Sequence, residues 1–201
     1  MPRLLSADDV ATFRGRLCEA AERLFAEQGP EAVTMRQLAA DLGCSPMTPY
    51  RYFKDKGEIL AAVRASAFDR LRQALDQALG AAAGRDAPAR AAVRVYADFA
   101  LTQPQAYRLM FDLAPLSEAA YPELVRAAEE ARNVIVRHLS GAVGPSSGPA
   151  WEMSGHRRWA ALHGALMLHF AQKLGPDIRV AALIEDLAAV GDRPARSATG
   201  G

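Results

Sequence analysis

Apolar residues recur at the helical period along almost the whole chain, and this periodicity limits the fold more than any other feature of the sequence. In the first segment Val10, Phe13, Leu17 and Leu24 follow one another at spacings that place them on one face of a helix. No run of useful length alternates apolar and polar residues as a half-buried strand does. The sequence therefore predicts an all-α protein.

Glycine and proline residues divide the chain into about nine expected helices. We expect a helix-turn-helix domain over residues 1–58, a larger helical domain over 59–191 and a flexible tail over 192–201. A chain of 201 residues, of which 50% are hydrophobic, is long enough to bury a sizeable core without disulfides or a metal ion.

The charge balance and the termini predict a cytoplasmic protein. The 24 Lys and Arg residues against 23 Asp and Glu give a net charge of +1, which excludes a polybasic coat but allows one basic face. The first ten residues lack the apolar region of a signal peptide, and the longest weakly polar run, residues 159–171, is too short to span a bilayer. Two cysteines are too few for a disulfide framework.

Several helix start and stop signals lie close together after residue 33. Thr34 and Gln37 have the spacing of a capping box, and Gly43 stands where a left-handed residue would end the helix. Ser45 followed by Pro46 predicts the start of a second short helix. Two short helices joined by a turn that contains glycine predict a helix-turn-helix unit.

The second of these helices distinguishes a DNA-reading unit from an ordinary corner in a helical bundle, which is the plain alternative. Residues 50–52 are Tyr-Arg-Tyr, with Lys54 and Lys56 directly after them. Residues 33–56 contain four Lys and Arg residues against two Asp, a net charge of +2. A third helix is expected after Asp55, with Glu58 as the partner in its capping box.

Residues 33–60 resemble the DNA-binding region of the tetracycline-repressor (TetR) family, whose signature matches the run Tyr50-Arg51-Tyr52-Phe53-x-x-Lys56-x-x-x-Leu60. The resemblance implies an all-α homodimer with a three-helix reader and a C-terminal domain that holds a small-molecule pocket. It also implies repression of the protein's own or a neighbouring promoter. Pro49 and Met47 depart from the family pattern, and Pro49 removes a backbone N–H, so we expect a tighter or bent reading helix.

The expected DNA contacts divide between phosphates and bases. Thr34 and Ser45 start helices, where hydroxyl and N–H groups suit phosphate oxygens, although capping alone would also explain them. The resemblance implies phosphate contacts for Tyr50 and Lys56 as well, with packing as the alternative for the tyrosine.

Base contacts need forked donors or an apolar contact to a thymine methyl. Arg36 and Arg51 supply the forked donors, with a solvated surface charge as the alternative for Arg51. Met47 and Thr48 are the candidates for the methyl contact. The whole set expected at DNA is Thr34, Arg36, Ser45, Pro46, Met47, Thr48, Tyr50, Arg51, Tyr52 and Lys56.

The run from Trp159 to Gly164 resembles a subgroup of TetR-type C-terminal domains named for their Trp, His and Gly residues, and residues 99–111 are similar to that subgroup too. The aromatic and methionine content favours an apolar or aromatic effector. The candidate effector contacts, for most of which an ordinary core is the alternative, are Tyr96, Phe99, Tyr107, Phe111, Trp159 and His163.

A stripe of mostly small residues, Ala161, Gly164, Ala165 and Leu168, lies beside the stripe that holds Trp159. Small residues let a second helix approach closely, so we expect a homodimer through the last two helices, the final one over 177–190. A two-fold dimer implies a palindromic operator in double-stranded DNA.

The histidines do not predict a metal or catalytic site. His156 and His163 are about 10 Å apart along a helix, too far to share one metal ion. We expect no catalytic residues, no metal and no cofactor, which leaves a helical-bundle enzyme as the weakest alternative. The leading hypothesis is a transcriptional repressor that a small-molecule effector releases from its operator. A dimeric DNA-binding regulator without an effector is the runner-up.

Overall fold

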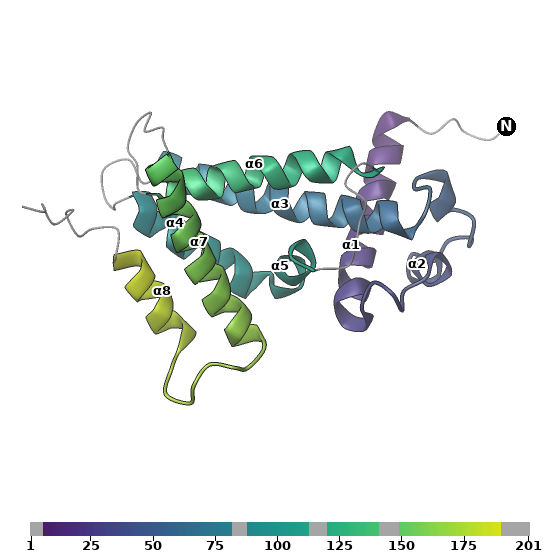
Figure 1. The fold of residues 1–201 in the computed structure, drawn as a ribbon. Helices are drawn as coiled ribbons and strands as arrows, with labels where there is room; N and C mark the ends of the chain where they lie inside the picture. Colours follow the sequence, from purple (N-terminus) through teal and green to yellow (C-terminus); the bar gives the residue numbers. More distant parts are fainter. Residues whose placement is uncertain (1–5, 82–87, 113–119, 141–148, 190–201) are drawn as a thin grey trace, which may run out of the picture. The chain divides into compact units, whose positions relative to one another are not determined.

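The computed structural model describes residues 6–81, 88–112, 120–140 and 149–189. Over these residues every regular element is helical, with eight α-helices and one 3₁₀ helix (Figure 1). This confirms the all-α prediction, whereas the expected tail, residues 192–201, lies outside the described residues. In chain order the elements are α1 (Ala7–Gln28), α2 (Met35–Asp41), η1 (Pro49–Arg51), α3 (Lys56–Ala81), α4 (Pro88–Thr102), α5 (Pro104–Met110), α6 (Pro122–Leu139), α7 (Pro149–Phe170) and α8 (Val180–Ala189).

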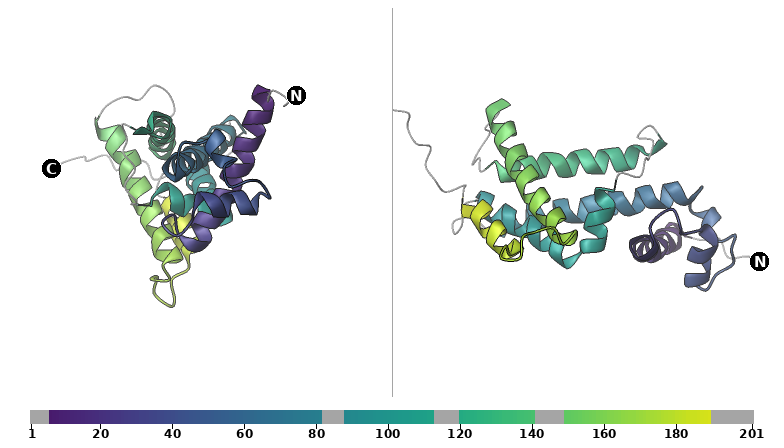
Figure 2. Two further views of the ribbon diagram at one scale, coloured as in Figure 1. Left: turned by 90° about the vertical axis from the view of Figure 1, so that its right-hand side faces the viewer. Right: turned by 60° about the horizontal axis from the view of Figure 1, so that its bottom comes forward.

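The chain forms two compact units, each made of two stretches of sequence. The first combines Met1–Asp69 with Gln103–Glu129, and the second combines Arg70–Thr102 with Glu130–Gly201. Helices α3 and α6 each have one end in the first unit and the other end in the second. Helix α3 therefore continues well past residue 58, the predicted domain boundary. The domain boundary placed there from sequence stays a prediction. Figure 2 shows the helices from two further directions.

One core cluster of the first unit is built from α1, α2, the start of α3, Val33, Phe53 and Leu109 of α5. Phe25, Leu38 and Phe53 are at most 2% exposed, and Leu42 packs against the cluster while partly exposed. Removing each such side chain from water stabilises the fold by about 1.5–3 kcal/mol. The buried cluster consists of Leu17, Ala21, Leu24, Phe25, Val33, Met35, Leu38, Phe53, Ile59, Leu60, Val63 and Leu109.

Local hydrogen bonds set the helix ends of this unit largely as the sequence predicts. The Thr34 N–H donates to Gln37 Oε1 at 2.8 Å, and the Gln37 N–H donates back to Thr34 Oγ1 at 3.2 Å. Gly43 has a φ of 64°, the left-handed conformation that favours glycine. The Glu58 N–H donates to Asp55 Oδ1 at 2.9 Å at the start of α3. The Glu58 carboxylate accepts from the Lys54 N–H at 2.6 Å and not from the Asp55 N–H, so Asp55 caps α3 without the full capping box that the sequence predicts. Each bond satisfies a backbone group that a helix end would otherwise leave without a partner.

The expected second helix of the helix-turn-helix unit is not an α-helix, and the prediction that Ser45 caps one is wrong. Residues 46–48 form a turn, and only Pro49–Arg51 continue as η1. Pro49 has no N–H to donate to the Ser45 carbonyl, so this carbonyl accepts from Thr48 N–H at 2.8 Å instead. The reading segment, as residues 45–52 are called below, is therefore wound more tightly than an α-helix.

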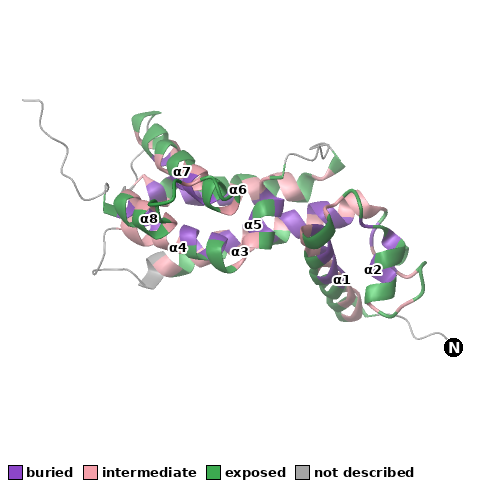
Figure 3. Cartoon of the chain, turned by 90° about the horizontal axis from the view of Figure 1, so that it is seen from below, coloured by how far each residue is buried: buried purple, intermediate pink, exposed green. Residues whose placement is uncertain are grey.

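The second unit contains α4, α7 and α8, with the ends of α3 and α6. On α7 the buried residues are Gly155, Leu162, Ala165 and Leu166. Ala165, one of the four residues of the small-residue stripe, thus packs within this unit, as its spacing of three from Leu162 explains. The dimer interface through that stripe stays a prediction. Exposed residues of α7 and α8 are green in Figure 3. None of the helices in the described ranges is long and apolar enough to cross a membrane.

Candidate nucleic-acid interface

The reading segment presents two large side chains to solvent. Met47 is 67% exposed and Tyr50 is 49% exposed, the two most exposed large hydrophobic residues of the first unit. Ser45, Pro46 and Arg51 are exposed as well, whereas Thr48 is half-buried and Pro49 is buried. A single exposed side chain of this size is common in folded proteins. Here Met47 and Tyr50 are exposed together with the hydrogen-bond donors of Ser45 and Arg51.

Helix α2 adds two exposed candidates from the sequence analysis, Thr34 at its N-cap and Arg36 in its first turn. The Thr34 hydroxyl both accepts the cap bond and donates to Gln37 Oε1 at 2.9 Å. Its capping role is therefore established in the free protein. A phosphate contact would come in addition and stays a prediction.

The acidic groups around this surface have internal partners. Asp41 accepts two hydrogen bonds from Arg23 Nη2, at 2.6 and 2.7 Å, and this contact raises the pKa of Arg23. Asp55 caps α3 through the Glu58 N–H. The guanidinium groups of Arg36 and Arg51 make no ion pair with the described residues. Within residues 33–56 both carboxylates thus accept hydrogen bonds from the protein, while these two guanidinium groups have no ionic partner among the described residues.

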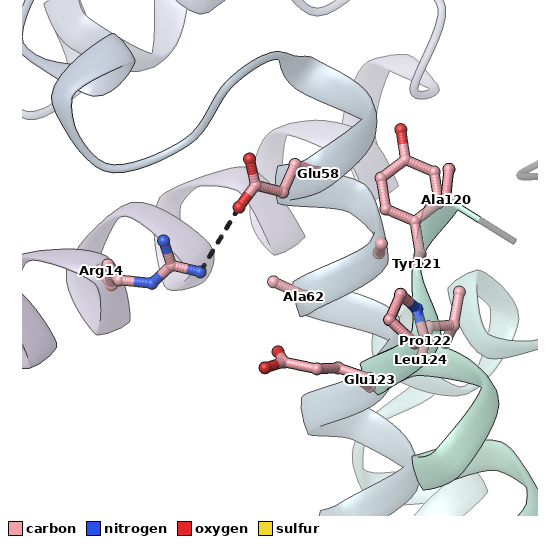
Figure 4. Close-up of a pocket in the computed structure, with 10 residues that line it drawn as sticks. Arg14, Glu58, Ala62, Ala120, Tyr121, Pro122, Glu123 and Leu124 are labelled. Carbon is pink, nitrogen blue, oxygen red and sulfur yellow. Dashed lines mark ion pairs between the residues drawn. The ribbon is translucent and has the colours of Figure 1, made fainter. Parts of the chain in front are cut away.

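Arg14 of α1 holds the end of the reading segment and was not a candidate from sequence. Its Nη1 donates to the Tyr52 carbonyl, and its guanidinium carbon lies 3.9 Å from the centroid of the Phe53 ring. Its Nη2 lies 3.8 Å from Glu58 Oε1 (Figure 4). One side chain thus joins α1, the reading segment and the start of α3. Its partner carbonyl lies 38 residues away along the chain, so no local sequence signal points to it.

Two of the predicted DNA contacts are used within the protein. Lys56 is half-buried, and its Nζ donates to the carbonyls of Pro30 and Glu31 at 2.6 and 3.2 Å. An ammonium group has a third N–H, which is the one that a phosphate would take. The ring of Tyr52 stacks on Phe13 with centroids 4.3 Å apart, so it packs against the core.

A pocket of about 260 Å³ lies beside Arg14 in the same unit. Figure 4 shows Arg14 on one side and Tyr121, the residue before α6, on the other, with Glu58 and Ala62 of α3 between them. A Cβ on Gly57 would lie 2.5 Å from the Tyr121 hydroxyl, so glycine is what lets Tyr121 approach α3. Burial, together with the charges of Asp55 and Glu58, raises the pKa of Tyr121.

The six effector candidates fall into two separate groups. Tyr96, Phe99, Trp159 and His163 lie in the second unit, where Trp159 Nε1 donates to the Tyr96 hydroxyl at 2.8 Å. Tyr96 is fully buried, and burial lowers the pKa of His163. The remaining two, Tyr107 and Phe111, lie in the first unit in an edge-to-face contact with centroids 5.1 Å apart.

None of these six residues belongs to the lining of the pocket beside Arg14 or to that of a second pocket between α6 and α7. Their role in effector binding stays a prediction. Membership of the subgroup named for its Trp, His and Gly residues stays a prediction as well. The described residues also contain no group of three or more His, Cys, Asp or Glu side chains placed to hold a metal ion.

Comparison with known proteins gives two family matches that together cover most of the chain. Residues 17–63 match the model of bacterial regulatory proteins of the tetR family, and residues 89–190 match that of the tetracyclin repressor-like C-terminal domain. The HTH-type transcriptional activator FasR of Mycolicibacterium smegmatis is 33% identical over 118 residues, which are 59% of this chain and 54% of FasR. The chain therefore spans about half the length of this curated relative.

Solved structures share the fold over nearly the whole chain. A protein with unknown function from Rhodococcus sp. RHA1 superposes with a TM-score of 0.72 at 26% identity, covering 89% of this chain and 92% of that one. The TetR family transcriptional regulator PfmR from Thermus thermophilus gives a TM-score of 0.61 at 23% identity, covering 88% of this chain and 95% of that one. The second likeness shows the fold alone.

Proposed function

The chain belongs to the TetR family of bacterial regulatory proteins and is thus a DNA-binding transcriptional regulator. We propose that it is a cytoplasmic repressor that binds a palindromic operator and that a small-molecule effector releases from it. The observation that carries the DNA-binding part is the surface of α2 and the reading segment. There the acids are paired within the protein, while Arg36 and Arg51 keep their charges without an ionic partner among the described residues. Uncompensated guanidinium groups on an exposed surface attract the phosphate backbone and can fork onto guanine edges.

The reading segment supplies the base contacts in this proposal. Arg51 and Arg36 donate to guanine edges, and the exposed Met47 contacts a thymine methyl group, with Thr48 beside it. The tight winding at Pro49 makes the segment narrower and longer than an α-helix of the same residues, since a 3₁₀ helix has three residues per turn and rises about 2.0 Å per residue. Side chains one turn apart then align differently along the major groove, which gives this protein a base preference different from that of a regulator with a regular reading helix.

The phosphate contacts surround this segment. The candidates are the hydroxyls of Thr34, Ser45 and Tyr50 and the third N–H of Lys56. Pro46 is exposed and carries no donor, so any contact that it makes is apolar. Such contacts position the protein on DNA without reading its sequence.

The dimer forms through α7 and α8 in our proposal. A Cβ placed on Gly164 would have no heavy atom within 4 Å, so the surface at this position is open to a partner helix. Ala160, Ala161 and Leu168 are exposed on the same helix, and Leu168 is 48% exposed. A two-fold dimer reads two half-sites one helical turn apart, about 34–36 Å.

Effector release requires that the effector bind one conformation of the dimer better than another. A coupling free energy of about 1–3 kcal/mol is typical for such regulators. Repression is one sign of regulation, and activation is the other candidate because the relative FasR is named an activator. A DNA-binding dimer without an effector is the remaining alternative.

The test is to recover genomic DNA fragments that the purified protein retains and to sequence them. We expect one or a few palindromic sites with half-sites one helical turn apart. Retention that shows no preferred sequence would overturn the proposal of an operator. A reporter gene behind a recovered site then separates repression from activation, because deleting the regulator raises expression in the first case and lowers it in the second.

The dimer interface has its own test in Gly164→Leu, measured by sedimentation. A leucine there holds the facing helix away, so we expect folded monomers. An intact dimer of normal stability would place the interface elsewhere.

A further inference from the structure

A pocket of about 310 Å³ lies in the second unit between the last turns of α6 and the first turns of α7. Helix α6 contributes four of its lining residues and α7 contributes three, and these are Arg132, Asn133, Val136, Arg137, Trp151, Glu152 and His156. Its volume is near the lower end of the range of ligand pockets, so an occupant is small.

A close helix crossing determines the position of the two walls. A Cβ on Gly155 of α7 would lie 2.4 Å from the Val136 carbonyl oxygen of α6, so the two backbones approach closely because this position is glycine. Val136 is itself 4% exposed and forms part of the pocket. The walls are therefore held by rigid helices rather than by a loop.

The polar groups of the pocket are mostly donors. Arg132, Asn133 and Arg137 are exposed, and their side chains make no hydrogen bond or ion pair with the described residues. The indole Nε1 of Trp151 is buried and has no hydrogen-bond partner among the described residues. The one carboxylate, Glu152, has its Oε1 3.8 Å from His156 Nε2. Donors without acceptors thus outnumber acceptors.

This imbalance has a chemical consequence. A buried N–H without an acceptor is destabilising, and native proteins leave few of them. Two guanidinium groups favour a planar anion that can accept several hydrogen bonds at once. We propose that this pocket binds a small organic carboxylate, whose oxygens accept from Trp151 Nε1 and from Arg132 or Arg137, with its apolar part against the indole ring.

The binding site stands independently of DNA recognition. That its occupant is the effector rests on the proposed function, because only a DNA-binding regulator has an operator affinity to change. The proposal also makes the effector anionic, whereas the aromatic residues chosen from sequence pointed only to an apolar or aromatic one.

The first experiment titrates phenylacetate into the full-length protein by calorimetry, without DNA. Phenylacetamide is the control ligand, since it keeps the ring and the shape but has no charge. We expect phenylacetate to bind at least about tenfold more tightly, because a charge-assisted hydrogen bond is about twice as strong as a neutral one. Equal affinities, or no binding of phenylacetate in the millimolar range, would overturn the proposal.

Variants then locate the site. Arg137→Gln and Arg132→Gln should each weaken phenylacetate binding, the more strongly contacting one by about tenfold. Trp151→Phe keeps an aromatic ring but removes the N–H, and it should weaken binding as well. Arg157→Gln is the matched control, because Arg157 is exposed on α7 outside the pocket and its loss changes the net charge equally.

If both pocket arginine variants bind phenylacetate as the Arg157→Gln control does, the site is not this pocket. Both arginines are exposed, so we expect these variants to melt at the wild-type temperature. Operator titration with phenylacetate then tests the effector role. Binding to the pocket in a protein that retains no operator would refute the proposed function alone, and operator retention without phenylacetate binding would refute the pocket alone.

Discussion

Replacing Arg14 by methionine tests how the reading segment is held in place. Arg14 donates to the Tyr52 carbonyl, lies 3.9 Å from the Phe53 ring centroid and has its Nη2 3.8 Å from Glu58 Oε1. Methionine keeps a long, flexible side chain at this position of α1 but removes all three polar contacts. The control is Arg16→Met, because Arg16 is exposed on the same helix and has no described partner.

The three contacts of Arg14 set the expected loss of stability. A hydrogen bond from a charged donor contributes about 1.5–3 kcal/mol. The cation–π contact adds about 0.5–1 kcal/mol. The ion pair, with side chains 37% and 36% exposed, adds about 0.2–1 kcal/mol. Because one group makes all three, their energies do not simply add, and we expect the free energy of unfolding to fall by about 2–3 kcal/mol.

Urea unfolding at fixed protein concentration, followed by circular dichroism, measures this change. Arg16→Met should shift the free energy of unfolding by less than about 0.5 kcal/mol. Operator affinity should also fall about tenfold in Arg14→Met, since reordering one freed backbone residue on DNA costs about 1–2 kcal/mol. Equal unfolding midpoints for the two variants would refute the structural role of Arg14. Unchanged operator affinity in a destabilised Arg14→Met would refute its link to the reading segment.

Three further predictions concern single side chains. Arg51→Ala should cost about 1–3 kcal/mol only at operators with the matched guanine, by competition binding, and a uniform loss would make it a phosphate contact. Gly155→Ala should lower stability by about 1–3 kcal/mol because its Cβ would meet the Val136 carbonyl, whereas Gly15→Ala on α1, with open space, should raise it by about 0.5–1 kcal/mol; equal melting temperatures would contradict the close crossing. Burial raises the pKa of Cys18 to about 11, so iodoacetamide at pH 8 should alkylate it about a hundredfold more slowly in the folded than in the urea-unfolded protein, by mass spectrometry, and equal rates would contradict its burial.

The sequence carried more information about which DNA-binding candidates lie near one another than about which effector candidates do. The DNA-binding candidates all lie within residues 34–56, where short helices and tight turns keep sequence neighbours close together. The effector candidates come from segments as far apart as Tyr96 and Trp159, which a tertiary hydrogen bond joins. Tyr107 and Phe111, chosen with them, lie in the other compact unit.

Local chemistry allowed the helix starts to be predicted from the sequence. The capping box at Thr34, the Asp55 cap of α3 and the left-handed Gly43 depend on groups within about four residues of one another. The all-helical fold follows from the same periodicity. The winding of the reading segment was open to prediction only in part, because Pro49 indicated a missing hydrogen bond but not how far the remaining residues would tighten.

Contacts between distant segments were decided by the tertiary structure alone. The position of Arg14 against Tyr52, the burial of Ala165 and the donor-rich pocket between α6 and α7 all depend on which faces of the helices meet. The physical reason is range. Helix caps and helical periodicity depend on groups within one or two turns of one another. The surroundings of Arg14 and of the Trp151 indole N–H depend instead on how distant helices pack in the folded chain.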